Sequence, residues 1–128
     1  AHLIEGTLLD NVIFGRCDIP TDEVLTVLNA VGLSHLYKNQ ADGLDFRISK
    51  SDKVLSEEER DRLLIARAII NNPKLLVLSF IGSPLLIEQR EQLIRHILEK
   101  YTETTLVVAT EHTLHLDWNT VDFNALKL

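Results

Sequence analysis

The stretch Glu111-His112-Thr113-Leu114-His115, followed by Asp117, gathers side chains that are able to bind a metal. Imidazole nitrogens and carboxylate oxygens are common ligands of zinc. On a helix, His112 and His115 would lie on one face, because residues three apart are neighbours there. The order is not H-E-x-x-H, and no further ligand is evident. Two surface or capping histidines account for the same residues, and we predict no metal ligand in this chain.

A second polar cluster marks the start of an expected helix. Ser56 followed three residues later by Glu59 is a capping box, in which each side chain binds the backbone N–H of the other residue. A helix N-terminus attracts anions. Here residues 57–59 are all Glu, which stabilise the helix through its dipole and repel a phosphate at the same end. An acidic first turn is also ordinary in helices that have no anion site.

The sequence contains no loop that would cradle phosphate groups. Such a loop has the pattern G-x-x-x-x-G-K-[ST], because glycine amides and a lysine must surround the phosphates. None of the 5 glycines is followed by lysine. We therefore expect no nucleotide cofactor to be bound by this chain alone.

Helices are expected in the first part of the chain. We expect four helices, over residues 8–14, 22–31, 34–37 and 57–70. Thr7, Thr21 and Ser56 are expected to cap the first, second and fourth of them, and the third begins at Ser34. An extended piece is expected over residues 46–48. The run Asn-Asn-Pro at 71–73 ends the last of these helices.

Strands and a long helix follow. Residues 75–78 form a continuous apolar run, typical of a strand covered on both faces in a parallel sheet. Ser83 is expected to cap a helix that has Pro84 in its first position. The inward stripe of this helix is expected to hold Leu86, Arg90, Leu93, Ile94, Ile97 and Leu98. Further along, residues 105–109 predict a second strand, 111–117 one helical turn or a loop, and 121–126 a weak third strand.

Composition excludes some functions. The net charge of −6 argues against nucleic acid as a partner, because phosphate binding requires clustered Lys and Arg. No run of about 18 apolar residues is present, so we expect a soluble chain with no membrane span, and no signal peptide. The single Cys17 excludes an internal disulfide and is expected to be at least partly buried. Because the chain has no methionine, not even at position 1, we expect a piece of a longer protein.

Several motifs in order resemble the ATP-binding cassette (ABC) nucleotide-binding domain. L-S-x-x-x-R at 55–60, A-R-A at 66–68, N-P-K-L-L-V-L at 72–78 and S-x-L at 83–85 are similar to the family's L-S-G-G-Q-R, its A-R-A, its apolar Walker B strand ending in Asp-Glu, and its S-A-L-D loop. Residues 3–15 look like the segment after the Q-loop of ABC exporters, and Gly43-Leu44-Asp45 like the stretch before the signature loop. The resemblance covers nearly the whole chain.

The positions that the family uses for catalysis differ in this sequence. Glu57, Glu58 and Glu59 replace the signature glycines and glutamine, and Leu86 stands at the D-loop Asp position. Ser79 and Phe80 stand at the Walker B Asp and catalytic Glu positions, and Glu111 follows Thr110 where the switch histidine is expected. A shift of one residue would let His112 take the switch position.

The resemblance implies an α/β fold that is part of a P-loop NTPase (RecA-like) ABC ATPase. Residues of about 1–72 would form a helical subdomain, and residues of about 73–128 a strand-helix-strand portion of the parallel core sheet. The remaining strands of that sheet are not in this chain.

The implied function is that of a cassette fragment from an exporter-type membrane transporter, with no catalytic residue and a structural or regulatory role. Ser56 would be the signature-loop serine that faces a partner's nucleotide; ATP and Mg²⁺ would be cofactors of the full parent only. The implied partners are the upstream half of the same domain, a transmembrane domain and a second nucleotide-binding domain at the cytoplasmic face of the membrane. Two alternatives stay open: an ATPase completed by an intact partner cassette, and a soluble interaction module derived from the fold.

Overall fold

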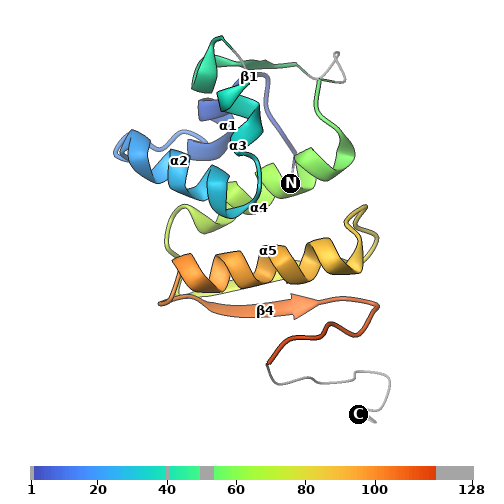
Figure 1. The fold of residues 1–128 in the computed structure, drawn as a ribbon. Coiled ribbons are helices and arrows are strands. Elements are labelled where there is room, and N and C mark those ends of the chain that lie inside the picture. Colours follow the sequence, from blue (N-terminus) through green and yellow to red (C-terminus); the bar gives the residue numbers. More distant parts are fainter. Residues whose placement is uncertain (1, 40, 50–53, 118–128) are drawn as a thin grey trace.

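The computed structural model describes residues 2–39, 41–49 and 54–117 (Figure 1). Along these residues, helices come first and then alternate with the strands of a parallel pair. The elements are β1 (Gly6–Thr7), α1 (Leu8–Ile13), α2 (Thr21–Ala30), α3 (Ser34–Lys38), the 3-10 turn η1 (Gly43–Asp45), β2 (Arg47–Ile48), α4 (Glu57–Ile69), β3 (Leu75–Ser79), α5 (Ile87–Lys100) and β4 (Thr105–Ala109). The weak strand predicted over 121–126 lies outside the described residues.

The predicted caps are confirmed for α1 and α4 but not for α2. Thr7 accepts the N–H of Asp10 at 3.0 Å, and the Asp10 carboxylate accepts the N–H of Thr7 at 2.9 Å. At α2 the cap is Pro20 rather than Thr21. The reason is that the Pro20 carbonyl already accepts the N–H groups of Glu23 and Val24, so Thr21 is the first residue of the helix.

Two short strands, β1 and β2, pair in antiparallel orientation and join the start of the chain to its middle. The sequence pattern did not predict this pairing. Gly6 pairs with Ile48 and Thr7 with Arg47. Strands of two residues are too short to show alternation. The pairing confirms the predicted extended piece at residues 47–48, whereas Phe46 ends the 3-10 turn η1.

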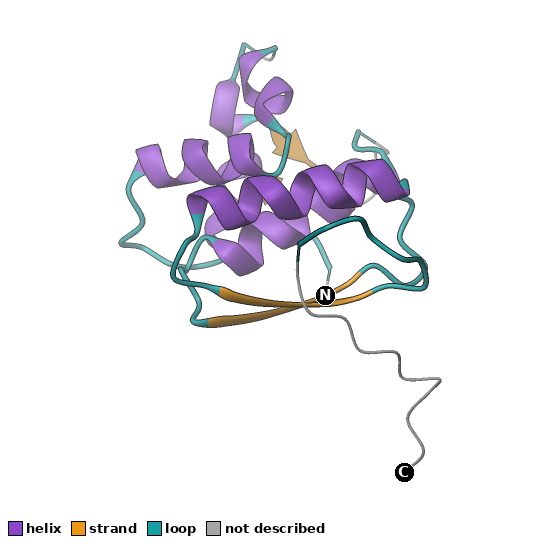
Figure 2. Ribbon diagram, turned by 60° about the horizontal axis from the view of Figure 1, so that its bottom comes forward, coloured by secondary structure: helices purple, strands orange, loops and turns teal. Residues whose placement is uncertain are grey.

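The predicted strands β3 and β4 are confirmed and pair in parallel, from Leu75 with Thr105 to Ser79 with Ala109. The expected burial of β3 on both faces is wrong. Leu76 and Leu78 are buried, whereas Leu75 and Val77 are 59% and 64% exposed. In the described part of the chain, the helices lie on one side of the strand pair only (Figure 2). The apolar run therefore supplies one buried face and one uncovered face.

The start of α5 differs from the prediction. The helix begins at Ile87, and Ser83 and Pro84 lie in the preceding turn. Ser83 Oγ is engaged there: it accepts the N–H of Leu85 at 3.2 Å and donates to Asp61 at 2.5 Å. The side-chain oxygen of Gln89 instead accepts the N–H of Leu86 at 2.8 Å and caps the helix.

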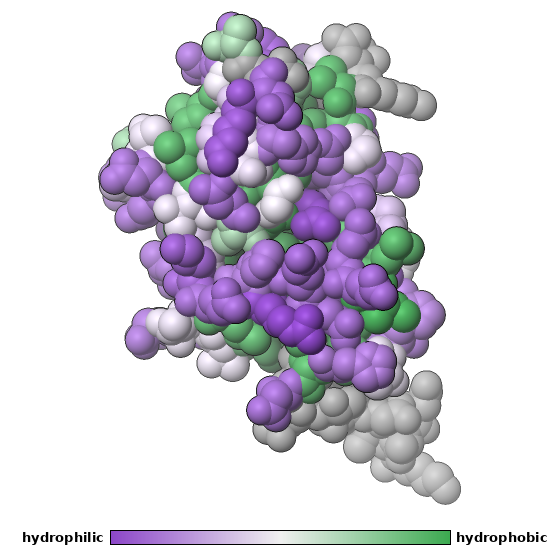
Figure 3. All heavy atoms as spheres, viewed as in Figure 1, coloured by the Kyte–Doolittle hydropathy of each residue, from purple (hydrophilic) through white to green (hydrophobic). Residues whose placement is uncertain are grey.

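The inward stripe of α5 is confirmed at its centre, where Arg90, Leu93, Ile94 and Ile97 are buried. It is wrong at its ends: Leu86 precedes the helix and is 69% exposed, and Leu98 lies past the edge of the buried face and is 43% exposed. The outward face of α5 carries mostly hydrophilic side chains (Figure 3).

One hydrophobic core joins the helices to the inner face of the strand pair. Its fully buried side chains include Leu8, Val24, Leu28, Leu63, Phe80 and Ile94. Across the residues that the structure describes, no helix has the length and apolar character needed to cross a membrane. The segment 111–117 contains no helix, so of the two predicted possibilities it adopts the loop.

Candidate functional site

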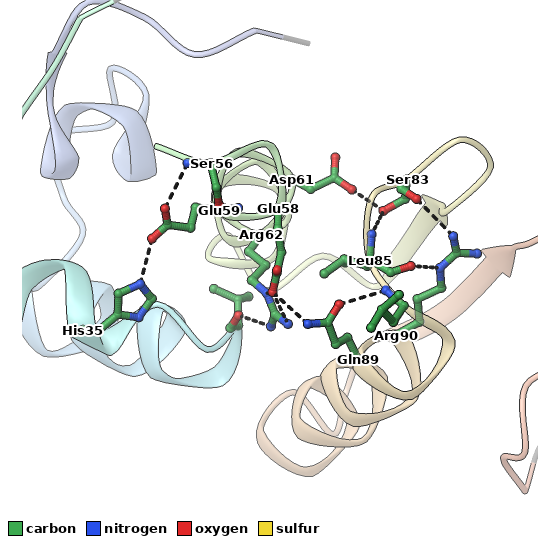
Figure 4. Close-up of polar contacts among 12 residues, drawn as sticks. His35, Ser56, Glu58, Glu59, Asp61, Arg62, Ser83, Leu85, Gln89 and Arg90 are labelled. Atoms are coloured by element: carbon green, nitrogen blue, oxygen red, sulfur yellow. Dashed lines mark hydrogen bonds and ion pairs between the residues drawn. The ribbon is translucent and has the colours of Figure 1, made fainter. Parts of the chain in front are cut away.

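The N-terminus of α4 forms the predicted capping box. Ser56 Oγ accepts the N–H of Glu59 at 3.1 Å, and Glu59 Oε1 accepts the N–H of Ser56 at 3.0 Å. The second carboxylate oxygen of Glu59 lies 2.7 Å from Nε2 of His35 on α3 (Figure 4). The hydroxyl expected to face a nucleotide is thus bonded within its own helix turn.

The Glu59 carboxylate stays ionised in this setting. Burial works to raise its pKa, but the hydrogen bonds from Ser56 and His35 outweigh burial and leave the pKa below the ordinary value. A fixed negative charge therefore stands at the helix end that would otherwise attract an anion.

Other carboxylates of the first turns of α4 connect this helix to α5 and to the turn that precedes it (Figure 4). Glu58 Oε1 lies 3.1 Å from the Arg62 guanidinium and accepts from the Gln89 amide at 3.2 Å. Asp61 accepts from Ser83 at 2.5 Å. These contacts neutralise part of the acidic charge and leave the carboxylates of Glu58 and Asp61 bonded within the protein. The residues present fit a capped, internally bonded helix end rather than a phosphate site.

The carboxyl end of β3 offers no acidic side chain. Ser79 is exposed, and its hydroxyl accepts the N–H of Ile81 at 3.4 Å. Phe80 is 1% exposed, and its N–H donates to the carbonyl of Ala109 at 2.8 Å. The prediction that Phe80 packs into the core is confirmed. Magnesium prefers carboxylate and phosphate oxygens, and these two residues do not fit it.

Arg90 is the central residue at the carboxyl ends of β3 and β4. Its side chain is 4% exposed. Nε donates to the Leu85 carbonyl at 2.9 Å, and one terminal nitrogen donates to the Ser83 carbonyl at 3.2 Å. The other terminal nitrogen lies 3.0 Å from both Thr110 Oγ1 and Glu111 Oε1. Arg90 also stacks on the Phe80 ring, 5.6 Å from its centroid.

Glu111, at the expected switch position, is held as a carboxylate. Its own backbone N–H lowers its pKa most strongly; burial opposes this, and Arg90 and His112 lower the pKa further. His112 lies beside it, with Nε2 3.6 Å from Glu111 Oε1 and a side chain that is 53% exposed.

Helical spacing predicts Arg90 in the inward stripe of its helix, but no partner for Arg90 is evident from the sequence. The available signal was its type: a charged residue among apolar ones on a buried face requires a counter-charge or several acceptors.

The two histidines of the 111–117 segment do not come together on a helix face. The N–H of His115 donates to Glu91, whereas His112 lies against Glu111. Within the described ranges, no three side chains of His, Cys, Asp or Glu are grouped to hold a metal ion. Cys17, expected to be at least partly buried, is exposed, because it lies in the irregular segment between α1 and α2.

Comparisons with known proteins give a consistent result. No family model matches the chain. It is 35% identical over 109 residues to the uncharacterised ABC transporter ATP-binding protein YwjA of Bacillus subtilis, covering 84% of this chain and 19% of that protein. It is 33% identical over 110 residues to the glutathione/L-cysteine transport system ATP-binding/permease protein CydC of Haemophilus influenzae, covering 85% of this chain and 19% of that protein.

A solved structure shows the same fold. A bacterial Atm1-family ABC exporter with ATP bound superposes with a TM-score of 0.73 at 19% identity, over 86% of this chain and 19% of that chain. The chain thus spans about a fifth of the length of the relatives it matches, in their C-terminal part. The chain has an α/β fold like that of an ABC exporter and is a homologue of the ABC exporter ATP-binding/permease proteins.

Proposed function

We propose that this chain is part of the ATP-binding cassette of an exporter-type transporter and that it hydrolyses no ATP itself. Residues of about 1–72 would be the helical subdomain, and residues of about 73–128 a portion of the RecA-like core. One observation carries the proposal: Phe80, at the position of the family's catalytic glutamate, is buried in the core. A phenyl ring cannot accept a proton from an attacking water.

The switch position supports the same function. A switch residue must be free to contact a bound nucleotide, whereas Glu111 is bonded to Arg90 at 3.0 Å. Its negative charge also opposes a negatively charged phosphate. The role that remains is structural or regulatory in ATP-coupled transport, with ATP and Mg²⁺ held elsewhere in the parent protein.

The uncovered face of the strand pair indicates a partner. Parallel sheets are almost always covered on both faces, yet Leu75, Val77 and Val107 are 59%, 64% and 48% exposed. We place the upstream half of the same cassette on this face. Residues 3–15 and the following helix would contact the transmembrane domain at the cytoplasmic side of the membrane, and a second cassette would face Ser56.

The test is MgATP turnover by the longer protein assembled with a second cassette that supplies the hydrolysis, with Glu111→Ala compared with wild type. We expect Glu111→Ala to leave turnover unchanged, because the side chain takes no part in hydrolysis. His112→Ala serves as a second variant, since a one-residue shift would place His112 at the switch position. A loss of turnover in either variant contradicts the proposal.

A composite ATPase with an intact partner cassette is the second candidate. It is favoured by Ser56, which keeps the signature position at a helix N-terminus. If this candidate holds, Ser56→Ala in this chain would reduce turnover at the partner's nucleotide. Unchanged turnover would limit Ser56 to its capping role.

A further inference from the structure

A single buried guanidinium contacts both loops that follow the parallel strands. We name these the β3 loop, residues 80–86, and the β4 loop, residues 110–117. Arg90 donates to the Ser83 and Leu85 carbonyls in the β3 loop. It donates to Thr110 and pairs with Glu111 in the β4 loop. No other side chain in the described part of the chain donates hydrogen bonds to both loops.

These contacts are relevant to function because both loops lie at the carboxyl ends of the parallel strands. In open α/β sheets, ligands bind beyond the carboxyl ends of the strands, and the loops there arrange themselves around the ligand. Here an arginine on α5 supplies the positive charge and the donors from inside the protein. Its planar fork presents five N–H groups in fixed directions, and its acceptors lie at 2.9 to 3.2 Å.

Further contacts fasten the β4 loop along α5. Leu114 is 6% exposed, in the core. The N–H of His115 donates to Glu91, and Arg95 donates to the His115 carbonyl at 3.1 Å. The loop therefore lies along the helix from Arg90 to Arg95 and is bonded at both ends.

We propose that Arg90 is an internal anchor that holds the β3 and β4 loops in one arrangement whether or not a nucleotide is bound to the parent protein. The oxygen atoms of the two loops that a ligand would otherwise hold in place are already held by hydrogen bonds from Arg90. The anchor is a property of this chain's own contacts. It holds or fails independently of whether the parent hydrolyses ATP.

The test is hydrogen exchange of the two loops, measured in the longer protein with and without MgATP. In the wild-type protein we expect the same protection of both loops in both conditions. Arg90→Gln removes the fork, and we expect exchange to rise about tenfold in both loops, since hydrogen bonds to a charged group are lost. Glu111→Gln should speed exchange in the β4 loop only.

The matched control is Glu88→Gln, on the exposed face of the first turn of α5, which should change neither loop. If Arg90→Gln fails to fold, Arg90→Lys tests the proposal instead. Lysine keeps the charge and the buried stem, but one ammonium group cannot reach all the acceptors. We therefore expect both loops of Arg90→Lys to exchange faster than in the wild-type protein. Unchanged exchange in the β3 loop of the folded Arg90 variant overturns the proposal. So does added protection of both wild-type loops by MgATP.

Discussion

Arg90 on α5 and Glu111 in the loop after β4 form an ion pair of 3.0 Å whose two members differ sharply in exposure, with side chains 4% and 38% exposed. Loss of the buried partner leaves several acceptors without a donor. We predict that Arg90→Met lowers the free energy of unfolding by about 3 kcal/mol. Glu111→Gln should cost clearly less, because the amide oxygen still accepts a hydrogen bond.

Urea denaturation of both variants measures these differences, with Glu88→Gln as the surface control. If Arg90→Met has the same free energy of unfolding as the wild-type protein, the ion pair and its neighbouring hydrogen bonds contribute nothing to stability.

The Ser56 cap gives a second prediction. Ser56→Ala removes the acceptor of the Glu59 N–H and should lower the free energy of unfolding by about 1 kcal/mol. Ser34→Ala is the matched control, since Ser34 is the first residue of α3, which has no side-chain capping hydrogen bond at its N-cap Leu33, and it should be close to neutral. Equal effects of the two substitutions would contradict a specific capping role for Ser56.

Acid should destabilise the fold through Glu59. Its pKa is lower in the folded chain than its ordinary value of 4.5. The ionised form therefore favours folding at pH values above about 4.5, and this stabilisation is lost as the pH falls through the folded pKa. The stability of Glu59→Gln should depend less on pH in this range. Some dependence should remain, because the pKa values of Asp10 and Glu111 are lowered too. Identical pH profiles for Glu59→Gln and wild type would refute this contribution.

Asn11 connects the N-terminal segment to α4. Its side chain is fully buried, accepts from Ile4 at 2.8 Å and Arg67 at 3.1 Å, and donates to the carbonyls of Ile4 and Thr7. Asn11→Ala leaves these groups unpaired in the core and should cost roughly 2 kcal/mol. Asn71→Ala, at an exposed position after α4, is the control for unfolding measurements. A neutral Asn11→Ala would mean that water replaces the amide.

Local patterns in the sequence predicted the features that depend on near neighbours. The caps at Thr7 and Ser56 need only a partner three residues away, and the apolar runs of β3 and β4 are continuous. The Ser83 cap was wrong because the helix begins later, at Ile87, where Gln89 caps it. The Ser83 hydroxyl instead accepts the N–H of Leu85 and donates to Asp61, which is distant in sequence. The exposed face of β3 was not predicted, because burial depends on which elements pack against a strand. An apolar run shows only that the strand has apolar side chains on both faces.

Features of the candidate site were likewise predictable where they depend on local sequence and unpredictable where they depend on the fold. The replaced positions at Ser79, Phe80 and Glu111 are read directly from motif order, and the burial of Phe80 confirms its expected packing. The partners of Arg90 were not predictable, since they come from two loops joined only by the fold. The nucleotide role of Ser56 stays a prediction.

The most direct test of the central claim is MgATP turnover by the longer protein alone, purified without any second cassette. The account predicts no turnover above background, with or without MgATP binding, because the positions of the catalytic glutamate and the switch histidine hold Phe80 and Glu111. Sustained hydrolysis by the isolated protein that Glu111→Ala or His112→Ala abolishes would contradict it.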